Sequence, residues 1–368
     1  MVPDHAHQAR QLIVSRLSLR RFRSYPRLDL DLAPGRVVVV GPNGVGKTNL
    51  LEALHVATQG FSPRTRVDAR LVRFGDDAAR VAAAGTRGGV PFESVVTIQG
   101  SGAKAATLDG APVASLDELR RALPVLVFTP DRLAVVKGGP LVRRTYLDRM
   151  LGRVAPAQAD IAGEYARALA QRNAALRRVG QGLAPSSSVD PWTEAVSRHG
   201  TALDAARAAL VDALGPGFAA HAAALGLTDA QLAYEHRPLA PEALAARLAR
   251  DLERGTTGLG PHLRDVGIAS GDRELRTFGS QGEQRVAVLA LLLAEAGLLL
   301  ESRGEAPVLL LDDVLSELDE QRRAALLAAT APGAQVVVTT TSLGTLPPAG
   351  PSPDLVVEVA PGTATVRA

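Results

Sequence analysis

The stretch VVVVGPNGVGKTNLLEALHVATQG, residues 37 to 60, decides the fold class of this chain of 368 residues. Its four valines form a β-branched run, which is typical of a short strand buried on both faces. Leu50, Leu51, Leu54 and Val56 follow with the spacing of an apolar helix face. Between them, a glycine-rich turn fits the pattern G-x-x-x-x-G-K-[ST], in which backbone N–H groups and a helix N-terminus surround a phosphate chain. The stretch therefore predicts a strand, a phosphate-binding turn and a helix within an α/β fold.

Lys47 is one of three lysines in the chain, where arginine supplies the other 38 basic residues (41 − 3). A lysine ammonium is a compact charge that suits the β- and γ-phosphates better than a planar guanidinium, and Thr48 offers a hydroxyl to Mg²⁺. The alternative, a chance match in a turn, is disfavoured by the strand before it and the helix after it. We therefore expect a bound nucleoside triphosphate. The candidate binding residues are Gly41, Pro42, Asn43, Gly44, Val45, Gly46, Lys47, Thr48 and Asn49.

Composition limits the classes of function. The chain has no cysteine, which excludes disulfides and cysteine-based zinc sites and fits a reducing, cytoplasmic location. Its net charge is only +3, so a basic surface for nucleic acid requires an uneven distribution of charge. Aromatic residues make up 3%, too few for a stacking platform of the kind that single-strand binders use. The N-terminal segment is polar and lacks an apolar signal core, and the longest apolar run, residues 286–300, is too short to span a bilayer.

Three segments differ in pattern. Residues 1–148 have the pattern of α/β structure and form the first part of an ATPase head, residues 149–255 are mostly helical, and residues 256–368 return to α/β structure. Hairpin signals at residues 88–89 and 109–110 indicate an antiparallel side sheet. The predicted strands are residues 12–19, 28–32, 37–40, 81–84, 94–98, 105–108, 125–128, 308–311, 335–340 and 355–359. The predicted helices are residues 158–179, 192–214, 241–254, 320–329 and a long helix from about residue 282, with a loop at residues 180–191.

A second candidate site lies in APVLLLDDVLSELDEQRRAAL, residues 306 to 326. A short apolar strand ends there in Asp312 and Asp313. In P-loop enzymes, a carboxylate at this position holds Mg²⁺, and a second acid orients the attacking water. We assign the first role to Asp312 and the second to Asp313. A strand that ends in two solvated acids is the alternative, but the lysine turn favours the functional interpretation.

A third candidate is the turn Ser280-Gln-Gly282-Glu283, which begins a long apolar helix. A serine hydroxyl, glycine N–H groups and a helix N-terminus together favour phosphate. Ser280 and Glu283 also have the spacing of a capping box, and the sequence of this turn alone favours that structural interpretation.

These motifs, in this order, resemble ABC-type ATPases of the SMC-like class, and they are still more similar to the RecF family of bacterial recombination mediators. The resemblance covers nearly the whole chain. Its segments are residues 19–35, 41–54, 127–148, 168–176, 260–262 and 311–319 together with the Ser280 turn.

The resemblance implies an α/β ABC-type P-loop ATPase head with an antiparallel side sheet and an inserted helical lobe. It implies that ATP and Mg²⁺ are bound between two heads, where Ser280, Gly282 and Glu283 of one chain face the P-loop of the other. It further implies ATP-dependent dimerisation on DNA, slow hydrolysis as a switch, and a role in recombinational repair and replication-fork maintenance. That role includes loading of a recombinase at single-strand gaps. RecR and RecO are the implied partner proteins.

The chain departs from the ABC pattern at several positions. Glu283 stands where transporter ATPases have glutamine, and Asp313 stands where most ABC ATPases have glutamate. Residues 339–341 are threonines, at a position where many ABC ATPases carry a histidine. Asp131 is the candidate for the missing glutamine after the strand at residues 125–128. After Gly-Pro-His, residues 260–262, the RecF family usually continues Arg-Asp-Asp, whereas this chain continues Leu263-Arg264-Asp265. This set of catalytic groups implies slow hydrolysis.

Two other classes of function compete with this interpretation, a transporter ATPase subunit (or another SMC-like ATPase) and a non-catalytic phosphate-binding scaffold. The DNA-contacting residues are left open, because each candidate arginine also has a structural interpretation. The candidates are Arg64, Arg66, Arg143, Arg144, Arg167, Arg172, Arg177 and Arg178.

Overall fold

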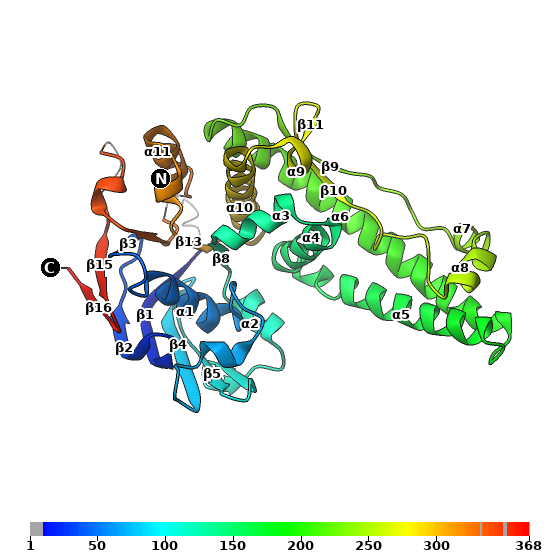
Figure 1. Cartoon of the computed structure of the whole chain (residues 1–368), viewed down its shortest axis with the longest axis horizontal. Helices are drawn as coiled ribbons and strands as arrows, with labels where there is room; N and C mark the ends of the chain where they lie inside the picture. The colour runs from blue at the N-terminus through cyan, green and yellow to red at the C-terminus, as the bar shows by residue number, and fades with distance from the viewer. Residues whose placement is uncertain (1–9, 332, 349–351, 368) are drawn as a thin grey trace, which may run out of the picture. The chain divides into compact units, whose positions relative to one another are not determined.

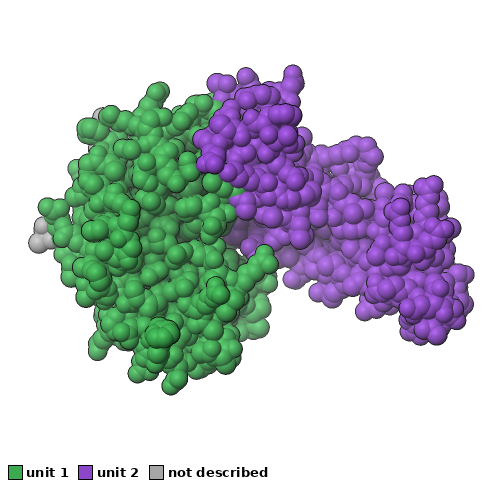
Figure 2. Space-filling view, in the orientation of Figure 1, with its two compact units in different colours: residues 1–133, 220–227, 285–368 green, residues 134–219, 228–284 purple. Residues whose placement is uncertain are grey.

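The structure, a computed structural model, describes residues 10–331, 333–348 and 352–367. The polar N-terminal segment, residues 1–9, lies outside this range. The chain divides into two compact units, which Figure 2 shows in green and purple. Unit 1 comprises residues 1–133, 220–227 and 285–368, and unit 2 comprises residues 134–219 and 228–284. The division into three segments at residues 148 and 255 stays a prediction.

The first sheet of unit 1 has six strands in the order β16-β15-β3-β14-β13-β8. All neighbours pair in parallel except β15 and β16. Because parallel strands end at the same edge, this order places the turns that follow β3, β14, β13 and β8 together. The strands are β3 (Arg36–Val40), β8 (Val125–Phe128), β13 (Val308–Leu311), β14 (Val336–Thr340), β15 (Leu355–Ala360) and β16 (Thr363–Val366).

The second sheet of unit 1 is the predicted antiparallel side sheet, and it has the order β12-β1-β4-β5-β6-β7 with β2 also paired to β1. The predicted hairpins are confirmed, because Arg87 pairs with Val90 and Leu108 with Ala111. Among the described strands of this sheet, only β12 runs parallel to its neighbour. The strands are β1 (Arg10–Phe22), β2 (Tyr25–Asp31), β4 (Ala78–Arg87), β5 (Val90–Gln99), β6 (Lys104–Leu108), β7 (Ala111–Pro112) and β12 (Glu305–Ala306).

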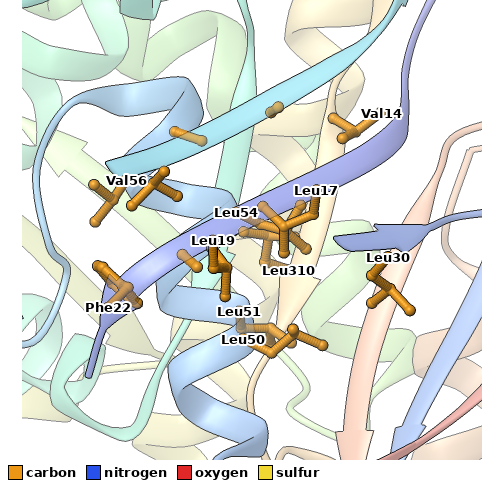
Figure 3. Packing of buried hydrophobic residues seen from close by; sticks show 14 of the residues in the cluster. Val14, Leu17, Leu19, Phe22, Leu30, Leu50, Leu51, Leu54, Val56 and Leu310 are labelled. Carbon is orange, nitrogen blue, oxygen red and sulfur yellow. The ribbon is translucent and has the colours of Figure 1, made fainter. Parts of the chain in front are cut away.

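Helix α1 (Lys47–Gln59), labelled in Figure 1, packs into an apolar cluster of unit 1. Figure 3 shows Leu50, Leu51 and Leu54 of α1 beside side chains of β1 and Leu310 of β13, so that both sheets contribute to one core. This burial fixes the direction of the helix whose first residue is Lys47. The other helices of unit 1 are η1 (Asp68–Leu71), α2 (Leu116–Ala122), η2 (Pro130–Leu133), η5 (Leu315–Glu317), α11 (Glu320–Ala328) and η6 (Leu343–Thr345).

Unit 2 is mainly helical but contains a small antiparallel sheet of order β11-β10-β9. Helix α6 extends ten residues beyond its predicted end and contains Pro216. Helix α10 (Gln281–Arg303) begins in unit 2 and continues in unit 1. The other elements are α3 (Ala134–Lys137), α4 (Pro140–Val154), η3 (Pro156–Gln158), α5 (Ile161–Gly180), η4 (Ser186–Val189), α6 (Asp190–Ala224), β9 (Ala230–Tyr234), α7 (Pro241–Ala245), α8 (Leu248–Arg254), β10 (Val266–Ser270), β11 (Arg273–Glu274) and α9 (Leu275–Phe278).

One detail of the helical prediction is wrong, because the helix expected over residues 241–254 is divided into α7 and α8. Residues 149–255 are mostly helical, but they also contain the strand β9, which was not predicted. Strand β9 could not be predicted, because its partner, β10, lies more than 30 residues further along the chain. A short strand that contains alanine also has no strong sequence pattern of its own. Among the helices that the structure describes, none combines the length and apolar character that a membrane crossing requires.

Candidate functional site

The phosphate-binding turn occupies residues 41–46, between the end of β3 and the start of α1. Gly46 has a φ angle of 116°, which side-chain-bearing residues rarely adopt. A Cβ atom at Gly46 would also lie 2.9 Å from Ser24 Oγ and 3.1 Å from Tyr25 Oη. The turn therefore requires glycine at this position on two independent grounds, and it leaves the first N–H groups of α1 available to an anion.

Lys47 is folded back over this turn. Its Nζ donates to the carbonyl oxygens of Gly41, at 2.7 Å, and Pro42, at 2.8 Å, and only 7% of the residue is exposed. An ammonium has three donors, so the third can reach a phosphate oxygen while the other two hold the lysine in place. Burial lowers the pKa of Lys47, an effect that the charges of Asp313 and Asp312 oppose.

Asp312, directly after β13, links the neighbouring strand β14 to the first turn of α1. Its Oδ1 accepts from Thr48 Oγ1 at 3.0 Å and from Thr339 Oγ1 at 2.9 Å. Burial raises the pKa of Asp312, although the two hydroxyls and the charge of Arg64 lower it in part. A divalent cation beside this carboxylate would offset the cost of burying its charge.

Asp313 follows directly, with a φ angle of 50° in the left-handed region. Its N–H donates to Thr339 Oγ1 at 2.8 Å, so the same hydroxyl positions both acids. Asp313 Oδ1 is buried and has no hydrogen-bond partner within the described residues. A buried oxygen of this kind needs a polar partner such as a water molecule or a nucleotide-bound group.

These residues fit ATP with Mg²⁺. The described part of the chain contains no group of three or more His, Cys, Asp or Glu side chains that would form a metal cage. Thr48 and Asp312 would supply two oxygen ligands to Mg²⁺, which is the usual protein contribution when substrate phosphates and water complete its shell. The orphaned oxygen of Asp313 and the third donor of Lys47 lie beside the same turn.

Sequence reasoning missed the groups that support the turn. Tyr25 Oη donates to the Gly46 carbonyl at 3.0 Å, and burial raises the pKa of Tyr25 to about 12. Glu52 of α1 is buried and accepts two hydrogen bonds from Arg23, at 2.9 and 2.8 Å. A glutamate within the apolar run LLEALHV was the available signal, because a buried carboxylate requires a cationic partner.

The Ser280 turn, in unit 2, forms a reciprocal capping box at the start of α10. Ser280 N–H donates to Glu283 Oε2 at 2.7 Å, and Glu283 N–H donates to Ser280 Oγ at 3.2 Å. These bonds and Arg273 lower the pKa of Glu283. Ser280 and Gly282 are exposed, and a Cβ atom on Gly282 would meet Ser280 Oγ only at 3.9 Å. The turn is thus both a helix cap and an open surface that a second molecule can approach.

The candidate arginines differ in burial. Arg143 and Arg172 are buried: Arg143 pairs with Asp265, and Arg172 pairs with Asp251 at 2.8 Å. Their positions exclude them as contacts to DNA in this structure. Arg144 donates to the Arg264 carbonyl at 2.8 Å. The exposed candidates are Arg64, Arg66, Arg167, Arg177 and Arg178.

Asp131, the candidate for the missing glutamine, is exposed in η2, which follows β8.

Comparison with known proteins identifies relatives over the full length. A family model described as "RecF/RecN/SMC N terminal domain" matches residues 13–360. The chain is 38% identical, over 370 residues, to the "DNA replication and repair protein RecF" of Myxococcus xanthus (strain DK1622), with 96% of this chain and 97% of the relative covered. It is 34% identical over 349 residues to the protein of the same name from Heliobacterium modesticaldum (strain ATCC 51547 / Ice1), with 91% and 94% covered.

Solved structures agree with this result. The chain has a TM-score of 0.85 and 26% identity, over 100% of both chains, to a structure described as "recombination mediator protein RecF-ATP in RecFOR pathway". It has a TM-score of 0.59 and 16% identity to an "SmcHead bound to the C-winged helix domain of ScpA", with 97% of both chains covered, a likeness of fold alone. The predicted fold class, an α/β head of the ABC ATPase type, is confirmed.

Proposed function

This chain belongs to the RecF family, and from that membership we propose that it is an ATP-dependent DNA-binding protein of recombinational repair and replication-fork maintenance. The observation that supports ATP binding most directly is the arrangement of Lys47, Asp312 and Asp313 at one edge of the parallel sheet. A transporter subunit is the rival function, but the family match over residues 13–360 favours the repair protein.

In this proposal the turn from Gly41 to Gly46 surrounds the phosphates with N–H groups, and Lys47 provides a positive charge at the β- and γ-phosphates. Thr48 and Asp312 hold Mg²⁺, which supplies charge neutralisation when it is bound. Asp313 accepts a hydrogen bond from the attacking water and orients it. Hydrolysis acts as a slow switch, because the general base is a single short carboxylate and residues 339–341 are threonines where many ABC ATPases carry a histidine.

ATP would also join two copies of the chain. The exposed Ser280 and Gly282 of one copy supply a hydroxyl and N–H groups to the γ-phosphate held by the P-loop of the other. The dimer closes on DNA at a single-strand gap, and hydrolysis releases it. RecR and RecO are the proposed partner proteins, in the cytoplasm, and the solved relative is described as part of a RecFOR pathway.

The direct test is sedimentation of the purified chain with and without ATP and with a gapped duplex. The proposal requires a monomer-to-dimer change that depends on ATP and a larger complex when gapped DNA is added. A chain that co-purifies only with an integral membrane protein, and that does not bind DNA with ATP present, would support the transporter alternative.

Lys47→Met should abolish the thermal stabilisation that ATP–Mg²⁺ gives to the wild-type chain. Ligand at a hundredfold its dissociation constant adds about 2.7 kcal/mol to the free energy of unfolding. Differential scanning fluorimetry with an ATP titration measures this shift. Lys137→Met is the matched control, since Lys137 is exposed at the end of α3 and should leave the shift unchanged. A full shift in Lys47→Met would remove the P-loop assignment.

Ser280→Arg should prevent ATP-dependent dimerisation while each chain still binds ATP. The bulky side chain would stand where the partner's γ-phosphate must lie, so the dimer dissociation constant should rise by about tenfold or more, which is about 1.4 kcal/mol. Sedimentation equilibrium with ATP and a non-hydrolysable analogue measures this change.

Ser115→Arg provides the control for Ser280→Arg. Ser115 caps α2 through Glu118 N–H, with the same serine–glutamate spacing as the Ser280 box. Both variants should lose about 1 kcal/mol of stability through the lost cap. If both also dimerise as readily as the wild-type chain, Ser280 is only a helix cap and the two-headed arrangement is wrong.

A further inference from the structure

Phe74 lies at the apex of a tight turn that follows η1, and its side chain is 100% exposed. Asp76 N–H donates to the Arg73 carbonyl at 3.0 Å, and Gly75 has a φ angle of 87°, as the third residue of a type II turn requires. Asp76 accepts ion pairs from Arg73, at 3.3 Å, and from Arg21, at 3.6 Å. The turn therefore presents an aromatic ring to solvent on a defined backbone.

The base of this turn is fixed to the core of unit 1. Arg73 N–H donates to the Arg21 carbonyl at 2.7 Å, and Phe22 forms a β-bridge with Val72. Phe22 and Leu71 are fully buried. These contacts leave little freedom for the turn to fold its ring inward, so the exposure of Phe74 is a property of the fold and does not arise from a loose loop.

The surroundings of Phe74 are positively charged. Arg21 and Arg73 both pair with Asp76, two residues after Phe74, and their side chains are 61% and 45% exposed. Arg66 and Arg70 are exposed in the segment that leads to the turn. Of the nearby acids, Asp68 pairs with Lys104 at 2.7 Å, Asp76 pairs with the two arginines, and Asp77 is exposed. Exposed arginines that pair at the turn, and others in the segment that leads to it, are complementary to a nucleic acid backbone, and the exposed ring is complementary to a base.

We infer that Phe74 stacks on an unpaired base where single-stranded DNA meets a duplex, while the arginines around it hold the adjacent phosphates. This inference rests on the proposed binding of DNA and names a contact within it. A base inside a duplex has both faces covered by its neighbours, whereas the first unpaired base offers a face to a ring. A single ring is enough for one base, although the aromatic content of 3% is too low for a platform along many bases.

A protein partner fits this surface less well. In the described segment of residues 60–77, the exposed large apolar residues are Phe74 and the half-exposed Val67, far less than the buried centre of a stable protein interface, and the same segment carries several exposed arginines. A nucleotide fits this surface better. Its base needs only the area of one ring for stacking, and its phosphates can pair with the arginines. Stacking is also tolerant of sequence, as a protein that acts at any gap requires.

The test compares dissociation constants for a gapped duplex and for a blunt duplex of the same length, measured by fluorescence anisotropy with ATP present. Phe74→Ala should weaken binding to the gapped duplex by about tenfold and leave binding to the blunt duplex unchanged. Phe74→Trp should retain the preference for the gap, because it retains an aromatic face. A 2-aminopurine at the first unpaired position should be quenched by the wild-type chain and by Phe74→Trp, but not by Phe74→Ala.

Val90→Ala is the matched control, since Val90 is an exposed apolar residue at another turn of unit 1 and should change neither constant. Sedimentation with ATP checks that Phe74→Ala still dimerises, as a fully exposed side chain outside the P-loop should allow. An unchanged preference for the gap in Phe74→Ala, or an equal loss on both duplexes, would overturn this inference and leave DNA binding itself intact. A wild-type chain that binds neither duplex would instead contradict the proposed function.

Discussion

Asp313→Asn is expected to lower the rate of ATP hydrolysis by about a hundredfold or more, because a positioned general base contributes roughly 10²–10⁴ to the rate. The amide keeps the shape of the side chain, and Asp313 N–H can still donate to Thr339 Oγ1. ATP binding should survive, since Lys47, Thr48 and Asp312 are unchanged. The variant should therefore accumulate as an ATP-bound dimer. Single-turnover hydrolysis and sedimentation of the same sample measure the two effects.

Two further variants make this test specific. Asp312→Asn should weaken Mg²⁺-dependent ATP binding as well as hydrolysis, because it removes the charged ligand that Thr48 and Thr339 hold in place. Thr339→Val removes the hydroxyl that both acids share and should lower the rate with a smaller effect on binding. Turnover of Asp313→Asn within twofold of the wild-type rate would place the general base at another residue.

The chemistry at the edge of the parallel sheet could be predicted from sequence because each part is local. Lys47 and Thr48 lie within one motif, and Asp312 and Asp313 follow one apolar strand. The link between them could not be predicted, because it depends on strand order. Strand β14 lies between β3 and β13 in the sheet, and this position makes Thr339 the common partner of Asp312 and Asp313.

Contacts between segments that are distant along the chain also could not be predicted from the sequence. The pairing of β9 with β10 joins residues that a loop and two helices separate. An arginine gives no sign of whether it lies in water or in the core, since the same side chain serves both environments. The helix α5 illustrates this limit, because Arg167 and Arg177 are exposed whereas Arg172 between them is completely buried.

The burial of Arg172 predicts a large loss of stability when its ion pair is broken. Arg172 Nη1 donates to Asp251 Oδ2 and to Thr257 Oγ1, each at 2.8 Å, and Arg172 Nε donates to Thr193 Oγ1 at 3.1 Å. Asp251 Oδ1 also accepts from Gly258 N–H at 3.1 Å. This network joins α5, α6 and α8 with the segment after α8. Arg172, one of the candidate DNA contacts, therefore stabilises unit 2 instead.

Asp251→Ala should therefore lower the free energy of unfolding by about 3–5 kcal/mol, the cost of leaving a buried charge without its partner. Urea denaturation, followed by circular dichroism, measures the change. Glu358→Ala is the matched control: its partner Arg367 is 55% exposed, and loss of such a surface pair should cost less than about 1 kcal/mol. The double variant Arg172→Met/Asp251→Leu removes both charges and should recover much of the loss, because no uncompensated ion then remains. If Asp251→Ala costs no more than Glu358→Ala, water must reach Arg172, and this arginine would again be a candidate for binding DNA.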